Sequence, residues 1–328
     1  MINIAILGTG KIIPEAIGAM QASKKFHVAK IWARAHSRDK AAALAEQFHV
    51  DGFTTELDDI LNDAAIQFVY VGLVNAVHYD YAKKFLSAGK NVIVEKPFTT
   101  SAAQAKELIN LALAKRLYLF EAITTLHQKN FSAIRDALPK IGAVKLVLCN
   151  FSQYSSRYDD YKNHIVAPVF DPKLYGGALM DLNIYNLNFV VGLFGAPKKI
   201  SCAVNRGWNG VDTSGIVTLE YENFLAQCVA AKDSASPSFL SVQGDGGYII
   251  AHGTPNELNS FELVIRGEEP KTFALNGTAH RMVQEFVDFG EIFERGDFSA
   301  VKRELKTSLD VMNVVEVIRD NFSSDHDH

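Results

Sequence analysis

The first 120 residues alternate short runs of β-branched and aromatic residues with longer stretches of helical pattern. Strands separated by helices do not pair as hairpins; they form a parallel sheet with helices on both faces. Right-handed crossovers then give a doubly wound α/β sheet of about six strands. The runs that read as strands are 3–7, 28–33, 68–71, 91–94 and 118–120. The helices expected between and after them are 11–20, 40–48, 78–88 and 101–115.

The pattern changes after Glu121. Between 199 and 274, strand-like runs follow one another with Gly, Asn and Pro turns between them, which predicts an open, mostly antiparallel sheet. The chain therefore divides into a parallel-sheet domain over 1–121 and an α+β domain over 122–328, whose last helix can pack back on the first domain. The other elements expected in the second domain are a helix 130–138, a strand 144–154, a polar loop 155–172 and helices 176–194, 280–293 and 301–322.

Charge and composition exclude several classes of protein. With 33 Lys and Arg against 37 Asp and Glu, the net charge is −4. A charge of that sign gives no electrostatic basis for binding nucleic acid or an anionic membrane. The longest apolar run, 68–74, is far shorter than the ~20 residues of a membrane-spanning helix. The predicted partner is a small molecule.

The cysteines and the two ends of the chain indicate a reducing compartment. Cys149, Cys202 and Cys228 are far apart and show no CxxC spacing, so we expect reduced thiols and no metal site. Met1–Leu7 lacks the basic and apolar regions of a signal peptide. We expect a cytoplasmic protein whose tail, 323–328, is a polar end rather than a metal site.

A glycine pair follows the first strand and opens the first helix. Gly8 permits a tight turn, and Gly10 lets the backbone approach a pyrophosphate, which the helix N-terminus then binds. Ile13 stands where this fingerprint usually has Gly or Ala. At the start of a β-α alternation the pair predicts a Rossmann dinucleotide site, the alternative being an ordinary strand-to-helix turn. The site residues expected here are Gly8, Thr9, Gly10, Lys11 and Ile12.

The end of the second strand bears on the choice of cofactor. NAD-binding chains usually place Asp or Glu there, on the ribose 2′-hydroxyl. Here the first acid is Asp39, and Arg34, Ser37 and Arg38 precede it. Arginines can bind a 2′-phosphate with two hydrogen bonds each. We therefore predict NADP, with NAD still possible; the alternative is a solvated basic turn.

Two further segments carry groups suited to catalysis. Lys96, in Glu95-Lys96-Pro97, lies at the carboxyl end of a parallel strand, where ligands of such sheets bind. Asp181 and Tyr185 are four residues apart, which places both on one face of a helix. A phenol and a carboxylate with a lysine could transfer a proton to or from a hydroxyl. Spacing alone favours a plainer interpretation, a surface lysine and a half-buried tyrosine.

Together these segments resemble the Gfo/Idh/MocA family of oxidoreductases, which includes glucose–fructose oxidoreductase and inositol dehydrogenase. The resemblance covers essentially the whole chain. Within the family, the dimeric dihydrodiol dehydrogenases and NADP-linked sugar dehydrogenases look most similar, because they too have two arginines after the second strand. The matching stretches are ILGTGKI (6–12), 78–98 with its EKP (95–97), FEAITTLH (120–127) and GGALMDLNIYNLNFVVGLFG (176–195).

The resemblance implies hydride transfer between a nicotinamide and a sugar-like, polyol or diol substrate. Lys96, Asp181 and Tyr185 match the family's catalytic positions, Tyr185 standing where many members have histidine. Tyr185 would exchange the hydroxyl proton, Lys96 would stabilise the alkoxide and lower the pKa of the tyrosine, and Asp181 would orient a substrate hydroxyl. The resemblance also extends the cofactor site to Asn75, His78, Glu95 and Lys96.

The resemblance also implies an assembly and leaves one other function open. In relatives the free face of the second sheet joins subunits, so we expect a homodimer or homotetramer. The alternative function is a catalytically idle cofactor-binding sensor; such members tend to lose the lysine that is present here. Three stretches depart from the family, so no particular substrate is implied, and neither Arg157 nor His164 selects one. These stretches are Gly72-Leu73-Val74, Asn183 and Thr124-Thr125-Leu126.

Overall fold

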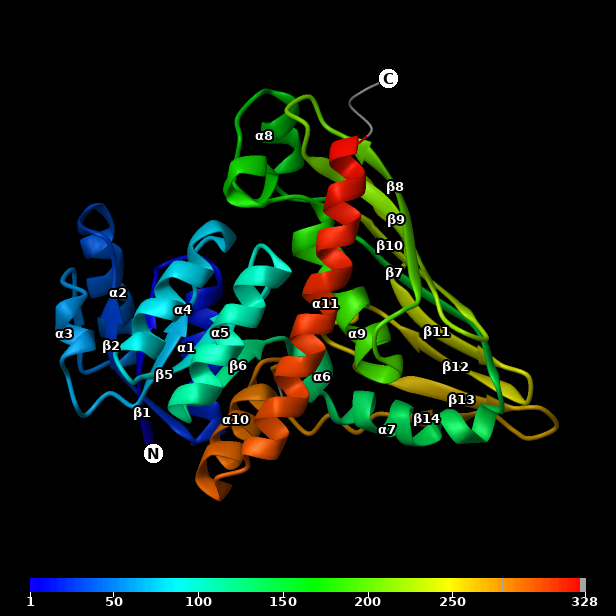
Figure 1. Ribbon diagram of the computed structural model, residues 1–328, viewed down its shortest axis with the longest axis horizontal. Helices are drawn as coiled ribbons and strands as arrows, with labels where there is room; N and C mark the ends of the chain where they lie inside the picture. The colour runs from blue at the N-terminus through cyan, green and yellow to red at the C-terminus, as the bar shows by residue number, and fades with distance from the viewer. Residues whose placement is uncertain (279, 325–328) are drawn as a thin grey trace. The chain divides into compact units, whose positions relative to one another are not determined.

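The computed structural model describes residues 1–278 and 280–324, and its internal contacts divide the chain into two units (Figure 1). Unit 1 comprises Met1–Ala122 and Thr278–Leu309. Unit 2 comprises Ile123–Gly277 and the chain from Asp310 onward. Unit 1 therefore contains a returning segment in addition to the residues predicted for the first domain. Residues 325–328 of the predicted polar tail lie outside the described residues.

Unit 1 is built on a six-stranded sheet in which every neighbouring pair is parallel. The spatial order is β3-β2-β1-β4-β5-β6. This confirms the predicted doubly wound sheet. The short edge strand, Gly52–Thr54, had no apolar run to predict it. The strands are β1 (Ile2–Leu7), β2 (Phe26–Trp32), β3 (Gly52–Thr54), β4 (Phe68–Val71), β5 (Asn91–Glu95) and β6 (Leu119–Ala122).

Helices between the strands and in the returning segment cover this sheet. Ser101 caps α5 by accepting a hydrogen bond from Gln104 N at 3.3 Å. Phe289 in α10 stacks on Phe120 of β6, with ring centroids 4.5 Å apart, so buried aromatic area ties the returning segment to the sheet. The helices are α1 (Ile12–Ser23), α2 (Arg38–Phe48), α3 (Asp58–Leu61), α4 (His78–Ser87), α5 (Ala102–Lys115) and α10 (Val283–Arg295).

The strand order of unit 1 determines where a ligand can bind. From β1 the chain proceeds outward through β2 and β3, and then returns to place β4 on the other side of β1. Ligands of such sheets bind beyond the carboxyl ends of the strands at this reversal. The segments that follow β1, β4 and β5 therefore meet at the ligand-binding edge.

Unit 2 is built on an eight-stranded sheet in the order β14-β13-β12-β11-β7-β10-β9-β8. Its pairs are antiparallel except β7 with β10, which is parallel. The predicted mostly antiparallel sheet is therefore confirmed. The strands are β7 (Val144–Ser152), β8 (Lys199–Arg206), β9 (Asp212–Glu220), β10 (Leu225–Ala231), β11 (Phe239–Gly244), β12 (Gly247–His252), β13 (Phe261–Ile265) and β14 (Lys271–Phe273).

Helices of unit 2 cover one face of this sheet. α9 (Ile184–Phe194) and the later part of α11 (Phe298–Ser324) lie along it (Figure 1). Side chains on that face are buried, and they include Cys149 and Cys228, which pair across β7 and β10. Unit 2 also contains α6 (Thr124–His127), α7 (Lys129–Ala137) and α8 (Tyr158–Lys162). Short 3-10 turns lie in both units: η1 (Ala35–Ser37), η2 (Asn75–Val77), η3 (Leu138–Ile141), η4 (Pro168–Phe170) and η5 (Pro172–Leu174).

Two predictions for unit 2 need correction. The expected polar loop 155–172 contains the short helix α8. The helix expected from Gly176 begins instead at Leu179, with a π-helical turn η6 (Leu179–Asn183) before α9. Gly177 has φ +117°, and the Asp212 carboxylate accepts the Leu179 N–H at 2.6 Å, so the helix starts where this carboxylate binds it.

Candidate active site

The glycine loop after β1 has the geometry that a dinucleotide requires. Gly8 has φ +118°, and a Cβ there would lie 2.5 Å from the Gly72 carbonyl oxygen, so no other residue fits. The Cβ position of Gly10 is open, which leaves its backbone accessible to a ligand. α1 begins two residues later at Ile12, with Lys11 at its N-cap. These features fit the pyrophosphate of a nicotinamide dinucleotide.

Two departures from the usual sequence pattern compensate for each other. Ile13 is fully buried where the fingerprint has Gly or Ala to allow close packing of helix and strand. A Cβ on Gly72, directly after β4, would lie 2.5 Å from Ile13 Cδ1. Gly72 therefore provides the space that the larger helix residue occupies.

The turn after β2 carries the basic residues predicted for the adenosine end of the cofactor. Arg34 is extended and exposed, and η1 leads directly into α2 at Arg38. The Arg38 guanidinium lies over the Phe53 ring, 5.3 Å from its centroid. Ser37 is half-buried, and Asp39 is exposed in the first turn of α2. This arrangement fits a 2′-phosphate better than a bare 2′-hydroxyl, because cationic and hydroxyl groups precede the first carboxylate.

The turn that presents Lys96 is held by a buried carboxylate within its own motif. Lys96 is half-buried at the carboxyl end of β5, and the Lys96–Pro97 peptide bond is cis. The Glu95 carboxylate accepts hydrogen bonds from the Lys96 backbone N–H, at 3.1 Å, and from the Tyr70 hydroxyl. Burial raises the pKa of Glu95. The predicted cofactor residue Glu95 is thus a buried support of the lysine turn.

Two further buried groups hold the other side of the turn. Glu121, on β6, accepts the Phe98 N–H at 3.0 Å, and burial raises the pKa of Glu121 to about 7. His78 is fully buried, with Nδ1 2.9 Å from the Pro97 carbonyl oxygen and Nε2 3.0 Å from that of Leu73. Burial lowers the pKa of His78. This ring links the segments after β4 and β5.

Asn75, also predicted to contact the cofactor, opens the 3-10 turn η2 after β4. It is half-buried, unlike the fully enclosed His78 three residues later. β4 neighbours β1, so Asn75 follows a strand at the ligand-binding edge of the sheet. Of these two residues, Asn75 is the one with side-chain surface to offer a ligand.

Unit 2 contributes the predicted carboxylate and phenol. Asp181 lies in the π-helical turn and Tyr185 in the first turn of α9. π-helical turns of this kind are frequent at functional sites. Tyr185 is half-buried and packs against a cluster that includes Phe151, with ring centroids 6.0 Å apart. The ring is fixed by apolar packing.

Sequence reasoning missed the residue that binds Asp181. Lys232 Nζ lies 2.5 Å from Asp181 Oδ2, and the lysine side chain is 2% exposed. The nearby Asp212 is also buried, and burial raises its pKa to about 6. One signal was available: Lys232 directly follows an apolar strand, as Lys96 does. Nothing in the sequence paired it with Asp181, 51 residues earlier.

Arg157 and His164, the two polar residues considered in the loop after β7, interact with side chains of the protein itself. Arg157 lies 3.8 Å from Asp160, in an exposed ion pair. The His164 ring lies 4.5 Å from that of Trp208. Among the described residues, no group of three or more His, Cys, Asp or Glu side chains could hold a metal ion.

Comparison with known families decides which group of proteins this is. The model of an oxidoreductase family with an NAD-binding Rossmann fold, Gfo/Idh/MocA, matches residues 2–122, and the GFO/IDH/MocA C-terminal domain matches residues 135–250. The chain belongs to the Gfo/Idh/MocA family. It is an oxidoreductase with a nicotinamide-dinucleotide fold, as the resemblance implied.

Individual members of the family are similar over most of their length. The uncharacterized oxidoreductase YgjR of Escherichia coli is 33% identical over 250 residues, which are 76% of each chain. The scyllo-inositol 2-dehydrogenase (NADP(+)) IolU of Bacillus subtilis is 29% identical over 97% of this chain and 96% of its own. KijD10, a 3-ketoreductase from Actinomadura kijaniata solved with NADP and TDP-benzene, is 20% identical, with a TM-score of 0.85 over 97% of each chain, which shows the shared fold.

These comparisons separate the two functions that the sequence left open. The Gfo/Idh/MocA relatives are named as oxidoreductases, dehydrogenases or reductases. They support the prediction of an enzyme, and they give no support to an idle sensor. In the described part of the chain, no helix has both the length and the apolar character that crossing a membrane requires.

Proposed function

We propose that this protein is an NADP-dependent dehydrogenase or reductase that acts on a CH–OH group of a sugar-like, polyol or diol substrate. The observation that carries the proposal is the lysine turn, in which Glu95, Glu121 and His78 are buried and hold the backbone around Lys96. A mere cofactor-binding module has no need of so closely held a lysine at a strand end. The similarity to IolU, which is named for scyllo-inositol and NADP(+), supports this substrate class.

The chemical roles follow from the residue types. Bound NADP supplies or accepts the hydride. Tyr185 exchanges the proton of the substrate hydroxyl, and its ring is already fixed by packing. Lys96 stabilises negative charge on the substrate oxygen. Asp181 accepts a hydrogen bond from a second substrate hydroxyl and orients it.

The cofactor preference rests on the turn after β2. Arg34, Ser37 and Arg38 bind the 2′-phosphate. Gly8, Thr9, Gly10, Lys11 and Ile12 surround the pyrophosphate, and Asn75 contacts the cofactor directly. His78 and Glu95 support the cofactor site indirectly: both side chains are buried and form hydrogen bonds with the backbone of the loop around Lys96.

We also propose a homodimer or homotetramer joined through the uncovered face of the unit 2 sheet. Strand pairing aligns side chains in rows on this face, and exposed or half-buried apolar side chains recur along these rows among polar ones. Ile216, Leu225 and Tyr248 are 43%, 47% and 43% exposed. A large apolar patch on a sheet is typical of a protein interface. The other apolar members of the face are Leu146, Leu148, Val229, Phe239, Ile250 and Val264.

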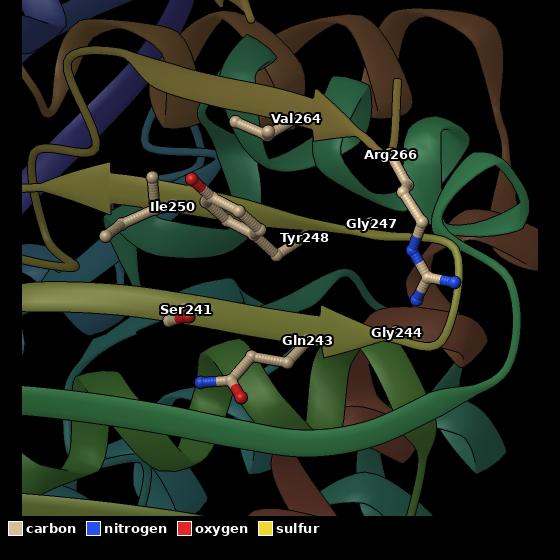
Figure 2. Close-up of a pocket in the computed structure, with 8 residues that line it drawn as sticks. All are labelled: Ser241, Gln243, Gly244, Gly247, Tyr248, Ile250, Val264 and Arg266. Atoms are coloured by element: carbon tan, nitrogen blue, oxygen red, sulfur yellow. The ribbon is translucent and has the colours of Figure 1, made fainter. Parts of the chain in front are cut away.

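Figure 2 shows a hollow on the same face, where side chains of a partner sheet could interdigitate. Gly244, Gly247, Tyr248 and Arg266 are among the residues that line it. Gel filtration or sedimentation tests the assembly: a particle of the 36.1 kDa of one chain would contradict it. Ile216→Asp, which places a charge on the β9 part of this face, should shift the assembly toward monomers.

We propose a cytoplasmic location. The support is the state of two cysteines: Cys149 and Cys228 are neighbours on β7 and β10, and both are buried thiols rather than halves of a disulfide. Proteins of oxidising compartments usually pair their cysteines in disulfides.

The experiment that tests the proposed activity is a substrate panel. Purified protein is assayed with NADP and with NAD against inositols, sugars and diols, and with NADPH against the corresponding ketones, by absorbance of the reduced cofactor. We expect turnover of at least one neutral polyhydroxy compound, with kcat/KM higher for NADP than for NAD. Binding of NADP without turnover of any member of the panel would contradict the proposal.

A further inference from the structure

A buried lysine of unit 2, Lys232, is bonded to the carboxylate of Asp181. The Lys232 backbone is held on both sides: its N–H donates to Thr213 O at 2.8 Å, and its carbonyl accepts the Ser155 N–H at 2.9 Å. The side chain is 2% exposed. Because both the backbone and the side chain are enclosed, the position of the ammonium group is set by the fold.

Among the described residues, three groups lie close to the ammonium, and Asp181 is the anion bonded to it. Nζ lies 2.5 Å from Asp181 Oδ2, 3.4 Å from the Val169 carbonyl oxygen and 4.9 Å from the centroid of the Phe170 ring. The nearby Asp212 directs Oδ2 to the Leu179 N–H instead. Its carboxylate caps the π-helical turn, and Asp181 is the bonded counter-ion of the lysine.

The two partners differ sharply in their access to solvent. The Asp181 side chain is 32% exposed, against 2% for Lys232. A ligand arriving from solvent can therefore reach the carboxylate but not the ammonium. Any effect of Lys232 on a substrate passes through Asp181.

The fold by itself has little need of this ion pair. Burying a lysine costs several kcal/mol of solvation, and replacing a buried pair by apolar residues is often neutral or stabilising. Removing only one partner, in contrast, leaves an uncompensated charge. A pair of this kind is well suited to keep a carboxylate ionised where it is partly removed from water.

We infer that Lys232 is a positioning residue that keeps Asp181 ionised and holds its carboxylate in one orientation as a hydrogen-bond acceptor for a substrate hydroxyl. The inference rests on the proposed function, in which Asp181 orients the substrate. It also gives the acceptor a preference: an anionic carboxylate binds neutral hydroxyl donors and repels substrates that carry a carboxylate of their own.

The test is a double-mutant cycle over Lys232→Met and Asp181→Asn, assayed with a polyol that the wild-type enzyme turns over. Lys232→Met should raise KM about 10–100-fold, as the loss of a charge-assisted hydrogen bond does, and change kcat much less. In the Asp181→Asn background the same substitution should change KM little, because no carboxylate remains to be positioned.

Lys90→Met is the matched control. Lys90 is also a buried lysine, 8% exposed, but it binds the backbone carbonyls of Asp63 and Ile66 in unit 1. The substitution Lys90→Met should lower the melting temperature and leave KM unchanged. An unchanged KM in Lys232→Met, or equal effects of Lys232→Met on KM in both backgrounds, would overturn the inference.

A second measurement separates this inference from the proposed function. If the wild-type protein turned over no polyol, the proposed function would fail. The same double-mutant cycle would then be evaluated from the melting temperatures of the variants. Lys232→Met should then destabilise the wild-type background much more than the Asp181→Asn background, because only an ionised partner is left uncompensated. Equal destabilisation in both backgrounds would show that Lys232 does not hold an ionised Asp181.

Discussion

The two units hold their proposed catalytic groups by different means. In unit 1 the backbone around Lys96 is held, by Glu95 at the Lys96 N–H and by Glu121 at the Phe98 N–H. In unit 2 the side chain of Asp181 is itself bonded, to Lys232. A long, flexible lysine can be aimed by its backbone and still adjust to charge on a substrate. A short carboxylate that orients a hydroxyl has to be fixed directly.

The prediction with the largest expected effect tests whether Lys96 of unit 1 and Tyr185 of unit 2 take part in the same reaction. Lys96→Ala and Tyr185→Phe should each lower kcat about 10²–10⁴-fold, the range for a positioned acid–base group, with a much smaller change in NADP affinity. Steady-state kinetics and cofactor titration of the same preparations measure the two quantities.

Tyr185→Phe also separates catalysis from packing. The variant keeps the ring that packs against Phe151, so its melting temperature should stay near that of the wild type. If Lys96 and Tyr185 depend on each other for catalysis, the double variant should be little slower than either single variant. Wild-type turnover in Tyr185→Phe would end its assignment as the proton-exchanging residue.

A backbone substitution in unit 2 should give the next largest effect. A Cβ on Gly177, which has φ +117°, would lie 1.9 Å from Asp212 Oδ1. Gly177→Ala should therefore lower the free energy of unfolding by about 3 kcal/mol, as a strained backbone with a steric clash does. Thermal or denaturant unfolding measures it.

Gly210→Ala is the control for Gly177→Ala. Gly210 also has a positive φ, +84°, but no atom lies within 4 Å of its Cβ position. It should cost only the strain of a left-handed residue, about 1–2 kcal/mol. Equal losses in the two variants would mean that Asp212 moves aside and does not define the start of the helix.

The third prediction concerns the cofactor end of unit 1. Arg38→Ala should weaken NADP binding roughly tenfold or more and leave NAD nearly unchanged, because only NADP carries the 2′-phosphate. Fluorescence or calorimetric titration with both cofactors measures it. Lys40→Ala, an exposed basic residue on the same helix, should change neither affinity. Equal losses for NADP and NAD in Arg38→Ala would contradict the assignment.

The last prediction probes the buried support of the lysine turn. Burial raises the pKa of Glu121 from 4.5 to about 7, so between these values the folded chain holds a proton that the unfolded chain has lost. The stability due to this proton is complete below about pH 4.5 and is lost as the pH rises through 7. Glu121→Gln cannot ionise, so its melting temperature relative to the wild type should increase over that range. A constant difference would show that Glu121 ionises normally.

Much of this protein could be read from local sequence. The parallel sheet, the glycine loop after β1 and Lys96 at the end of β5 all depend on short segments, whose periodicity and turn residues act within a few positions. Asp181 and Tyr185 were proposed from a segment of five residues together with the family resemblance, because their spacing places them on one helix face. The family comparisons agree with this local reading of fold and enzyme class.

Only the tertiary structure decided which distant residues support these groups. Lys232 binds a carboxylate 51 residues away, and Glu121 holds a backbone N–H 23 residues away. Gly72 makes room for Ile13 across a helix and a strand. Such pairs leave no periodic trace in the sequence, because packing brings their partners together after the local elements have formed. The π-helical turn before α9 has the same origin, because the Asp212 carboxylate that caps it belongs to β9.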